Sequence, residues 1–280
     1  MVSLRTRLAQ AFAAFGKALC YLLLFLISQV LVSSGYTLTA ALYANMNPGL
    51  KIDPTELTML CTDQISLVSG LLTLLLVAVF FLLRHKNPLR ETGFRATPAR
   101  CVCAAGVMMP IVYAVIIFVL SVLPEAWLAD YMEAAESLSQ TGVIITVATI
   151  IVAPLVEEII FRGLVLSRLR KGMSNWLAVV VSALLFGACH GQIVWICYAF
   201  VIGLLLGLIA LRSGSIWPSL LAHILFNAIG QFSVYLPETD SAYWIFLGSL
   251  VLFSIIAMPI FHRGMTTLLF PRRRKEPAHE

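Results

Sequence analysis

Long apolar runs recur along the whole chain, and they constrain its fold more than any other feature. Of the 280 residues, 60% are hydrophobic and only 12% are Asp, Glu, Lys or Arg, whereas a soluble domain carries about 25% charged residues. A helix needs about 20 apolar residues to cross the hydrocarbon core of a bilayer, and such runs follow one another through the sequence. The composition excludes an ordinary water-soluble globule and indicates an integral membrane protein.

The apolar runs predict helices rather than a β-barrel. A barrel strand alternates apolar and polar residues over about 10 positions, and stretches such as residues 71–83 show no alternation. Within hydrocarbon, a continuous apolar segment satisfies its own backbone hydrogen bonds as a helix. We expect an all-α polytopic protein with about eight spans, at residues 18–40, 65–83, 101–123, 141–167, 175–190, 193–211, 215–235 and 242–261.

The positions of Lys and Arg predict how these spans are oriented, because basic residues stay on the cytoplasmic side of a membrane. With a cytoplasmic N-terminus, 17 of the 19 Lys and Arg residues fall in cytoplasmic segments. The external loops hold nine acidic residues, namely Asp53, Glu56, Asp63, Glu125, Asp130, Glu133, Glu136, Glu238 and Asp240. We therefore expect both termini in the cytoplasm. This topology and attraction to anionic lipid explain the net charge of +5, so we expect no nucleic-acid partner.

Two short segments flank the predicted membrane domain of residues 18–261. Residues 1–17 combine one apolar face with basic residues elsewhere, which predicts an amphipathic helix at the interface. Residues 262–280 are predicted to form a basic cytoplasmic tail. We expect the first span to be an uncleaved anchor, since no convincing cleavage site follows it. The six cysteines are scattered and are expected to be small apolar side chains rather than a disulfide framework.

Few strongly polar side chains remain inside the predicted spans, and they occur in three helices. They are Glu157, Glu158 and Arg162 in the fourth span, His190 at the end of the fifth, and His223 with Asn227 in the seventh. Each charged residue at a helix centre costs about 2.5 to 3.5 kcal/mol, so these charges need partners. Glu158 and Arg162 are four residues apart and can pair, leaving Glu157 to point elsewhere. Pro154, one turn earlier, can kink the helix beside the acids.

Depth in the membrane tests independently whether these residues converge. At about 1.5 Å per residue, Glu157 and His223 lie roughly 15 to 16 Å from the predicted cytoplasmic edge. By the same measure His190 and Asn227 lie roughly 21 to 22 Å from it, in a core roughly 30 Å thick. Structural alternatives exist: an ion pair that only fixes helix packing, hydrogen bonding between helices and an interfacial His190. The common depth favours one polar cavity, and intramembrane ionisable residues are functional candidates by default.

These residue types suit hydrolysis of a peptide bond. Glu157 can accept a proton from water that His190 orients, and His223 with Asn227 can donate to a developing oxyanion. A second arrangement uses Glu157, His190 and His223 as ligands of a catalytic zinc ion. The residues leave both open. The chain lacks the His-Glu-x-x-His and Gly-x-Ser-x-Gly motifs of other hydrolases.

The ordered motifs Glu157-Glu158-x-x-x-Arg162, Phe186-x-x-x-His190 and His223-x-x-x-Asn227 resemble those of the CaaX protease and bacteriocin-processing (CPBP, Abi) family of intramembrane endopeptidases. The resemblance covers about residues 140–235 and implies an eight-helix fold. It implies that Glu157 and His190 activate water, that Glu158 and Arg162 support them, and that His223 and Asn227 stabilise the oxyanion. The family has been described both as metal-dependent and as glutamic proteases. Gly203-x-x-x-Gly207 is predicted to allow close helix packing.

Three functions remain open on the sequence. The leading hypothesis is an intramembrane endopeptidase that acts on a membrane-associated protein or peptide. The alternatives are a proton-coupled transporter, in which Glu157, Glu158 and His190 form a relay, and a non-catalytic membrane scaffold or immunity protein. We expect the plasma (inner) membrane as its location, or the endoplasmic reticulum if the host is a eukaryote.

Overall fold

A computed structural model describes residues 4–50, 53–138, 142–237 and 239–269. Every regular element in these ranges is helical, which confirms the predicted all-α fold. In chain order the elements are α1 (Leu4–Met46), η1 (Pro48–Leu50), α2 (Pro54–Met59), α3 (Thr62–Leu83), α4 (Pro88–Glu91), α5 (Ala99–Val107), α6 (Met109–Ser121), α7 (Glu125–Leu138), α8 (Val143–Val147), η2 (Ala148–Val152), α9 (Ala153–Glu157), η3 (Glu158–Leu166), α10 (Ser167–Leu169), α11 (Asn175–Ala188), α12 (Ile193–Ser213), α13 (Trp217–Ser233), α14 (Asp240–Ala257) and α15 (His262–Leu269).

Several of the described helices are long and apolar enough to cross a membrane. By length and composition there are five, at Arg5–Met46, Thr62–Leu83, Ala99–Ser121, Val143–Leu169 and Ile193–Ser213, and a sixth if α14 and α15 are one span bent by 94°. Helices α11 and α13 have 14 and 17 residues, fewer than the roughly 20 that a full span needs. The chain is a polytopic membrane protein, while the count of eight spans and the cytoplasmic position of both termini stay predictions.

Helix α1 joins two segments that the sequence separates. The predicted interfacial helix of residues 1–17 and the first predicted span belong to one helix of 43 residues, with no break at residue 17. The reason is local, since no proline interrupts the sequence before Pro48. The interfacial role of residues 1–17 stays a prediction. At the other end of the chain, α15 covers the start of the predicted tail, and residues 270–280 lie outside the described residues.

The predicted span 141–167 is observed as a run of α-helical and π-helical segments over Val143–Leu169. Pro154 lies in α9, between the π-helical segments η2 and η3. Because proline has no backbone N–H, it interrupts the regular hydrogen-bond pattern there. The sequence predicted a kink at Pro154. The structure shows π-helical segments on both sides of this proline, and the span continues through it. Segments of π-helix are rare and are frequently found at functional sites.

Segment η3 forms the packed centre of the molecule. All nine of its residues are buried, and its large apolar side chains pack with α1, α3 and α11 in one cluster. The Phe161 ring makes edge-to-face contacts with Phe25 of α1 and Phe186 of α11, with ring centroids 6.2 and 5.2 Å apart. Ser182 of α11 also donates its hydroxyl to the Phe161 carbonyl oxygen over 3.1 Å. These contacts hold in place the segment that carries Glu158 and Arg162.

Helices α11 and α12 approach closely at two glycines. A Cβ atom added to Gly203 would lie 3.2 Å from the Cα atom of Ala183, and one added to Gly207 would lie 3.2 Å from a methyl group of Val179. Contacts this short leave little room for a side chain, so the predicted close packing at Gly203 and Gly207 is confirmed. This approach brings the Gly203 carbonyl next to the buried Arg162.

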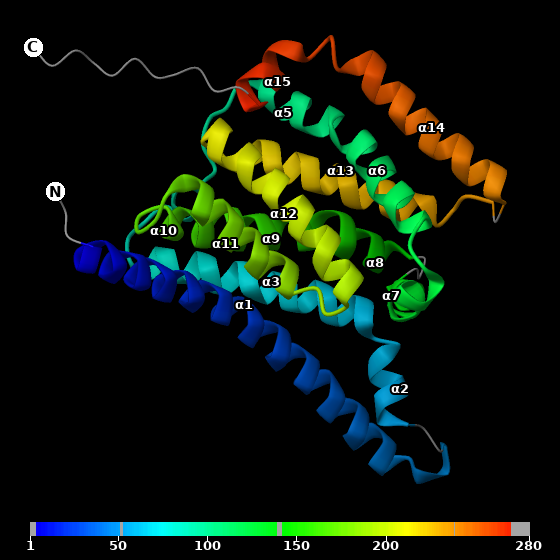
Figure 1. Ribbon diagram of the computed structural model, residues 1–280. Coiled ribbons are helices and arrows are strands. Elements are labelled where there is room, and N and C mark those ends of the chain that lie inside the picture. The colour runs from blue at the N-terminus through cyan, green and yellow to red at the C-terminus, as the bar shows by residue number, and fades with distance from the viewer. Residues whose placement is uncertain (1–3, 51–52, 139–141, 238, 270–280) are drawn as a thin grey trace, which may run out of the picture.

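The helices run alternately between two ends of the molecule. Figure 1 shows the described start of α1, α10 and α15 at one end, and α2, α7 and α8 at the other. Helix α12 starts at the α7 end and finishes at the α10 end, while α13 runs the opposite way (Figure 1). As a result, residues that are distant in sequence lie close together at each end of the molecule.

Candidate active site

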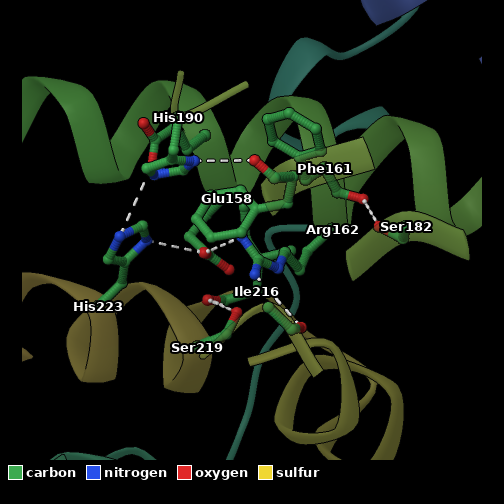
Figure 2. A network of polar contacts seen from close by, with 11 residues as sticks. Glu158, Phe161, Arg162, Ser182, His190, Ile216, Ser219 and His223 are labelled. Carbon is green, nitrogen blue, oxygen red and sulfur yellow. Dashed lines mark hydrogen bonds and ion pairs between the residues drawn. The ribbon is translucent and has the colours of Figure 1, made fainter. Parts of the chain in front are cut away.

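His223 of α13 contacts both glutamates of the helical run Val143–Leu169. Its Nδ1 atom lies 3.0 Å from Oε1 of Glu158, and its Nε2 atom lies 3.5 Å from Oε2 of Glu157. Figure 2 shows the His223 ring, on α13, facing Glu158 of η3. The structure therefore brings together groups that are 65 residues apart in sequence.

Glu158 and Arg162 form a buried ion pair. Arg162 Nη1 donates to Glu158 Oε1 over 2.7 Å, and the two side chains are 1% and 0% exposed. The guanidinium also lies over the ring of Phe186, 4.4 Å from its centroid, where the π face attracts a cation. A second nitrogen, Nη2, donates to the Gly203 carbonyl over 3.4 Å. The predicted pairing of Glu158 with Arg162, with Glu157 directed elsewhere, is confirmed.

The hydrogen positions on His223 follow from its neighbours. A carboxylate only accepts hydrogen bonds, so the bond to Glu158 requires a proton on Nδ1 when Glu158 is ionised. A second proton on Nε2 would make the ring an imidazolium that faces a carboxylate from each side. Together with Arg162, this state balances two negative charges with two positive ones.

His190 follows the end of α11 and is oriented by Phe186. Its Nδ1 atom lies 2.9 Å from the Phe186 carbonyl oxygen, which can only accept, so Nδ1 is the donor. The Nε2 atom is then the nitrogen with a free lone pair in the neutral ring. The Phe186 ring packs against His190 and His223 at centroid distances of 4.8 and 5.8 Å. One aromatic side chain therefore holds both imidazoles.

Asn227 lies one turn after His223 on α13 and is bound to the π-helical segment η2. Its Nδ2 atom donates to the Thr149 carbonyl oxygen over 2.9 Å. A side-chain amide carries two N–H groups, so this bond uses one of them. The bond sets the direction of the amide, and the second N–H remains available to another acceptor.

The predicted site residues form two groups, according to whether they line a cavity of about 1030 Å³. Glu157, His190, His223 and Asn227 line it, and so does Phe186. Glu158 and Arg162 are not among the described residues that line it, because they are packed behind His223. Four of the six predicted residues can therefore touch a molecule in the cavity, whereas the other two can influence such a molecule only through their neighbours.

The cavity also contains residues that the sequence analysis missed. Gln231 follows Asn227 at the same four-residue spacing and lines the cavity, and its buried Nε2 atom has no hydrogen-bond partner. The spacing His223, Asn227, Gln231 is the signal that could have identified it. Tyr and Trp side chains from four helices also line the wall, namely Tyr113, Tyr131, Trp195, Tyr198 and Tyr243, and no motif marks them.

The side chains do not form a metal site in this arrangement. Among the described residues, no group of three or more His, Cys, Asp and Glu side chains could hold a metal ion. Both ring nitrogens of His223 lie near carboxylate oxygens, and Nδ1 of His190 is bound to the Phe186 carbonyl oxygen. Glu157, His190 and His223 therefore do not fit the zinc ligand set that we considered, and we derive no step through zinc.

Comparisons with known proteins agree with the motif resemblance. Residues 139–229 match a family described as "Type II CAAX prenyl endopeptidase Rce1-like", and this range contains all six predicted site residues. The resemblance to CaaX proteases is thus confirmed over that segment. An Escherichia coli protein described as "Uncharacterized 24.3 kDa protein" is 36% identical over 94 residues, which cover 31% of this chain and 43% of that relative. The matched part is less than half of the relative. No solved structure matches the chain.

Proposed function

We propose that this protein is an intramembrane endopeptidase that hydrolyses a peptide bond of a membrane-associated protein or peptide. The observation that supports this most is the contact of His223 with both Glu157 and Glu158 at the wall of a large cavity. An ion pair that served helix packing alone would have no need of a second carboxylate facing open space. The side chain of Glu157 is 20% exposed, so water in the cavity can reach it.

The first step is attack by water on the peptide carbonyl. Glu157 accepts a proton from the water while Nε2 of His190 orients it, and the oxygen of the water bonds to the carbonyl carbon. The carbonyl oxygen gains the negative charge. The N–H on Nε2 of a cationic His223 and the second N–H of Asn227 are donors for this oxyanion, and a charged donor forms the stronger bond.

The second step breaks the peptide bond. The protonated Glu157 gives its proton to the leaving nitrogen, the C–N bond breaks, and the products are a carboxylic acid and an amine. Glu158 and Arg162 take no part in the proton transfers, because both are buried away from the cavity. Their role is to hold the His223 ring in place, through the bond from Nδ1 to Glu158 and the pairing of Glu158 with Arg162.

Comparative analysis of membrane peptides tests this function without a known substrate. Cells that express the wild-type chain are compared with cells that express Glu157→Gln, which keeps the size of the side chain and removes its basicity. The matched control is Glu56→Gln, on an exposed acid of α2 outside the cavity lining. We expect new peptide termini, produced by cleavage, in cells with the wild type or the control. These termini should be absent in cells with Glu157→Gln. Ends that persist with Glu157→Gln would refute the proposal.

The same variants separate the other two functions. A proton-coupled transporter would show pH-driven flux in proteoliposomes that depends on Glu157, without new peptide ends. A scaffold or immunity protein would keep its biological effect when Glu157 is replaced by Ala. We propose that the protein lies in the plasma (inner) membrane of its host, with the endoplasmic reticulum as the alternative in a eukaryote. Membrane fractionation would distinguish the two locations.

A further inference from the structure

Acidic and basic side chains outside the site lie mostly at opposite ends of the helices, and Glu91, which pairs with Lys86 at the basic end, is an exception. One end carries the exposed acids Glu56 and Glu125, together with Asp130 on α7. The other end carries most of the described basic residues, including Arg84 and Lys86 after α3 and Arg170 and Lys171 after α10. Figure 1 shows the two groups of segments at opposite ends of the bundle, with α7 and α2 at one and α10 at the other.

The cavity lies towards the acidic end. Its wall takes residues from the last turns of α6 and α13 and from the first turns of α12 and α14, and these turns meet at that end. It extends from Glu157 to Ser121, Met132 and Val234, which are exposed. Helix α7, which bears Glu125 and Asp130, contributes Tyr131 and Met132 to the wall. No Lys or Arg occurs among the described lining residues.

The opposite direction is closed by packing. On the side of Glu158 that faces the basic end, Leu164, Val165 and Leu169 are fully buried in the central cluster. The Glu158–Arg162 pair itself is buried, and Gly203 of α12 closes against it. Within the described residues, packing therefore closes the cavity towards the basic end, and its exposed lining residues lie towards the acidic end.

Basic segments are retained in the cytoplasm, which predicts that the basic end faces the cytoplasm and that the acidic end faces the other compartment. We propose that the site opens on the non-cytoplasmic side of the membrane and that its substrates are peptide segments that enter from that side. This inference rests on the proposed function and narrows its substrate class. Segments exposed on the non-cytoplasmic face reach Glu157, whereas cytoplasmic chain ends do not. The apolar and aromatic wall suits a segment with large apolar side chains.

Cysteine labelling in oriented membrane vesicles tests the side on which the cavity opens. The six native cysteines are replaced by Ala, and single cysteines are introduced as Ser121→Cys and Val234→Cys at the mouth. Ala96→Cys, at the basic end, is the matched control, and its position is also exposed. A membrane-impermeant maleimide should label the two mouth positions in right-side-out vesicles and the control in inside-out vesicles. The reverse pattern would overturn the inference.

A second measurement uses the wild-type chain, in case the cysteine-free protein does not fold. Lys86 and Lys171 are exposed at the basic end and react with an impermeant amine reagent. We expect both to be modified in inside-out vesicles and protected in right-side-out vesicles, as read by mass spectrometry. Modification of either residue from the outside would place the basic end on the non-cytoplasmic face and contradict the inference.

The position of the cleaved bonds separates this inference from the proposed function. New chain ends that depend on Glu157 should map to non-cytoplasmic segments of their parent proteins. Ends in cytoplasmic segments would overturn the direction of entry and leave the endopeptidase function standing. If no Glu157-dependent ends exist, the endopeptidase function fails and the substrate class falls with it, while the vesicle labelling still reports the side on which the cavity opens.

Discussion

The Nδ1 atom of His223 lies 3.0 Å from Oε1 of Glu158, and the two side chains are almost fully buried. This bond makes Glu158 the shared partner of His223 and Arg162, since Arg162 Nη1 contacts the same oxygen over 2.7 Å. A single carboxylate oxygen thus connects the packed centre of the protein to the cavity. Changes on either side of that oxygen should affect stability and cleavage in different proportions.

Replacing Glu158 by Gln should lower stability strongly. The change leaves Arg162 without its countercharge in a site that excludes water, and breaking a buried pair costs about 3 to 5 kcal/mol. The double change Glu158→Gln with Arg162→Met removes both charges and should recover much of this loss. Thermal denaturation of the purified proteins in detergent measures the stability of the three variants. If the double variant loses the sum of the two single losses, the pair is not coupled as its geometry indicates.

Replacing Phe186 by Leu should reduce cleavage more than stability. The Phe186 ring contacts both imidazoles and the guanidinium, and Leu fills part of the space without orienting the rings. Misplacement of a catalytic group by 1 Å can cost about 100-fold in rate, so we expect a loss of that order. Phe118→Leu, at an exposed position of α6, is the control. Cleavage by Phe186→Leu equal to that by the control would show that the imidazoles keep their orientation without the ring.

The sequence predicted which polar residues meet because a charge in hydrocarbon is costly and needs a partner. That argument identified the Glu158–Arg162 pair and the convergence of Glu157 with His223. It did not predict that His223 turns a nitrogen to each glutamate, since spacing gives the face of a helix and not its rotation against another helix. Tyr131 and Trp195 escaped notice because an aromatic residue in an apolar helix has the same pattern whether it packs or lines a cavity. No sequence pattern predicted the π-helical segments around Pro154.

Replacing Gln231 by Leu should stabilise the protein and impair cleavage. The Nε2 atom of Gln231 is buried without a hydrogen-bond partner, and an unpaired buried donor costs about 1 to 3 kcal/mol. Leu has similar volume and removes this cost. If the amide donates to the bound peptide, the same change weakens binding of the substrate. A higher melting temperature with lower cleavage is the expected result, and unchanged cleavage would assign Gln231 to the wall alone.

Replacing Gly203 by Ala should impair cleavage more than replacing Gly207 by Ala. A methyl group at Gly203 would press on Ala183 and on the Phe186 ring, whereas one at Gly207 meets the side chain of Val179. Overpacking of this kind costs about 1 to 3 kcal/mol, and at Gly203 the displaced groups include Phe186, which holds both imidazoles. Gly248→Ala is the control, because no atom lies within 4 Å of a Cβ added there. Equal cleavage by the Gly203→Ala and Gly207→Ala variants would contradict the expected effect of displacing Phe186.

Removal of metal ions should leave cleavage unchanged. His223 directs both nitrogens at carboxylate oxygens, and His190 Nδ1 is bound to the Phe186 carbonyl, so neither imidazole is arranged with Glu157 around a common ion. Elemental analysis of the purified protein should find much less than one zinc ion per chain, and dialysis against a chelator should not reduce the Glu157-dependent peptide ends. Stoichiometric zinc that is lost in His190→Ala and His223→Ala, together with loss of cleavage on chelation, would require the two histidines to turn towards a shared ion.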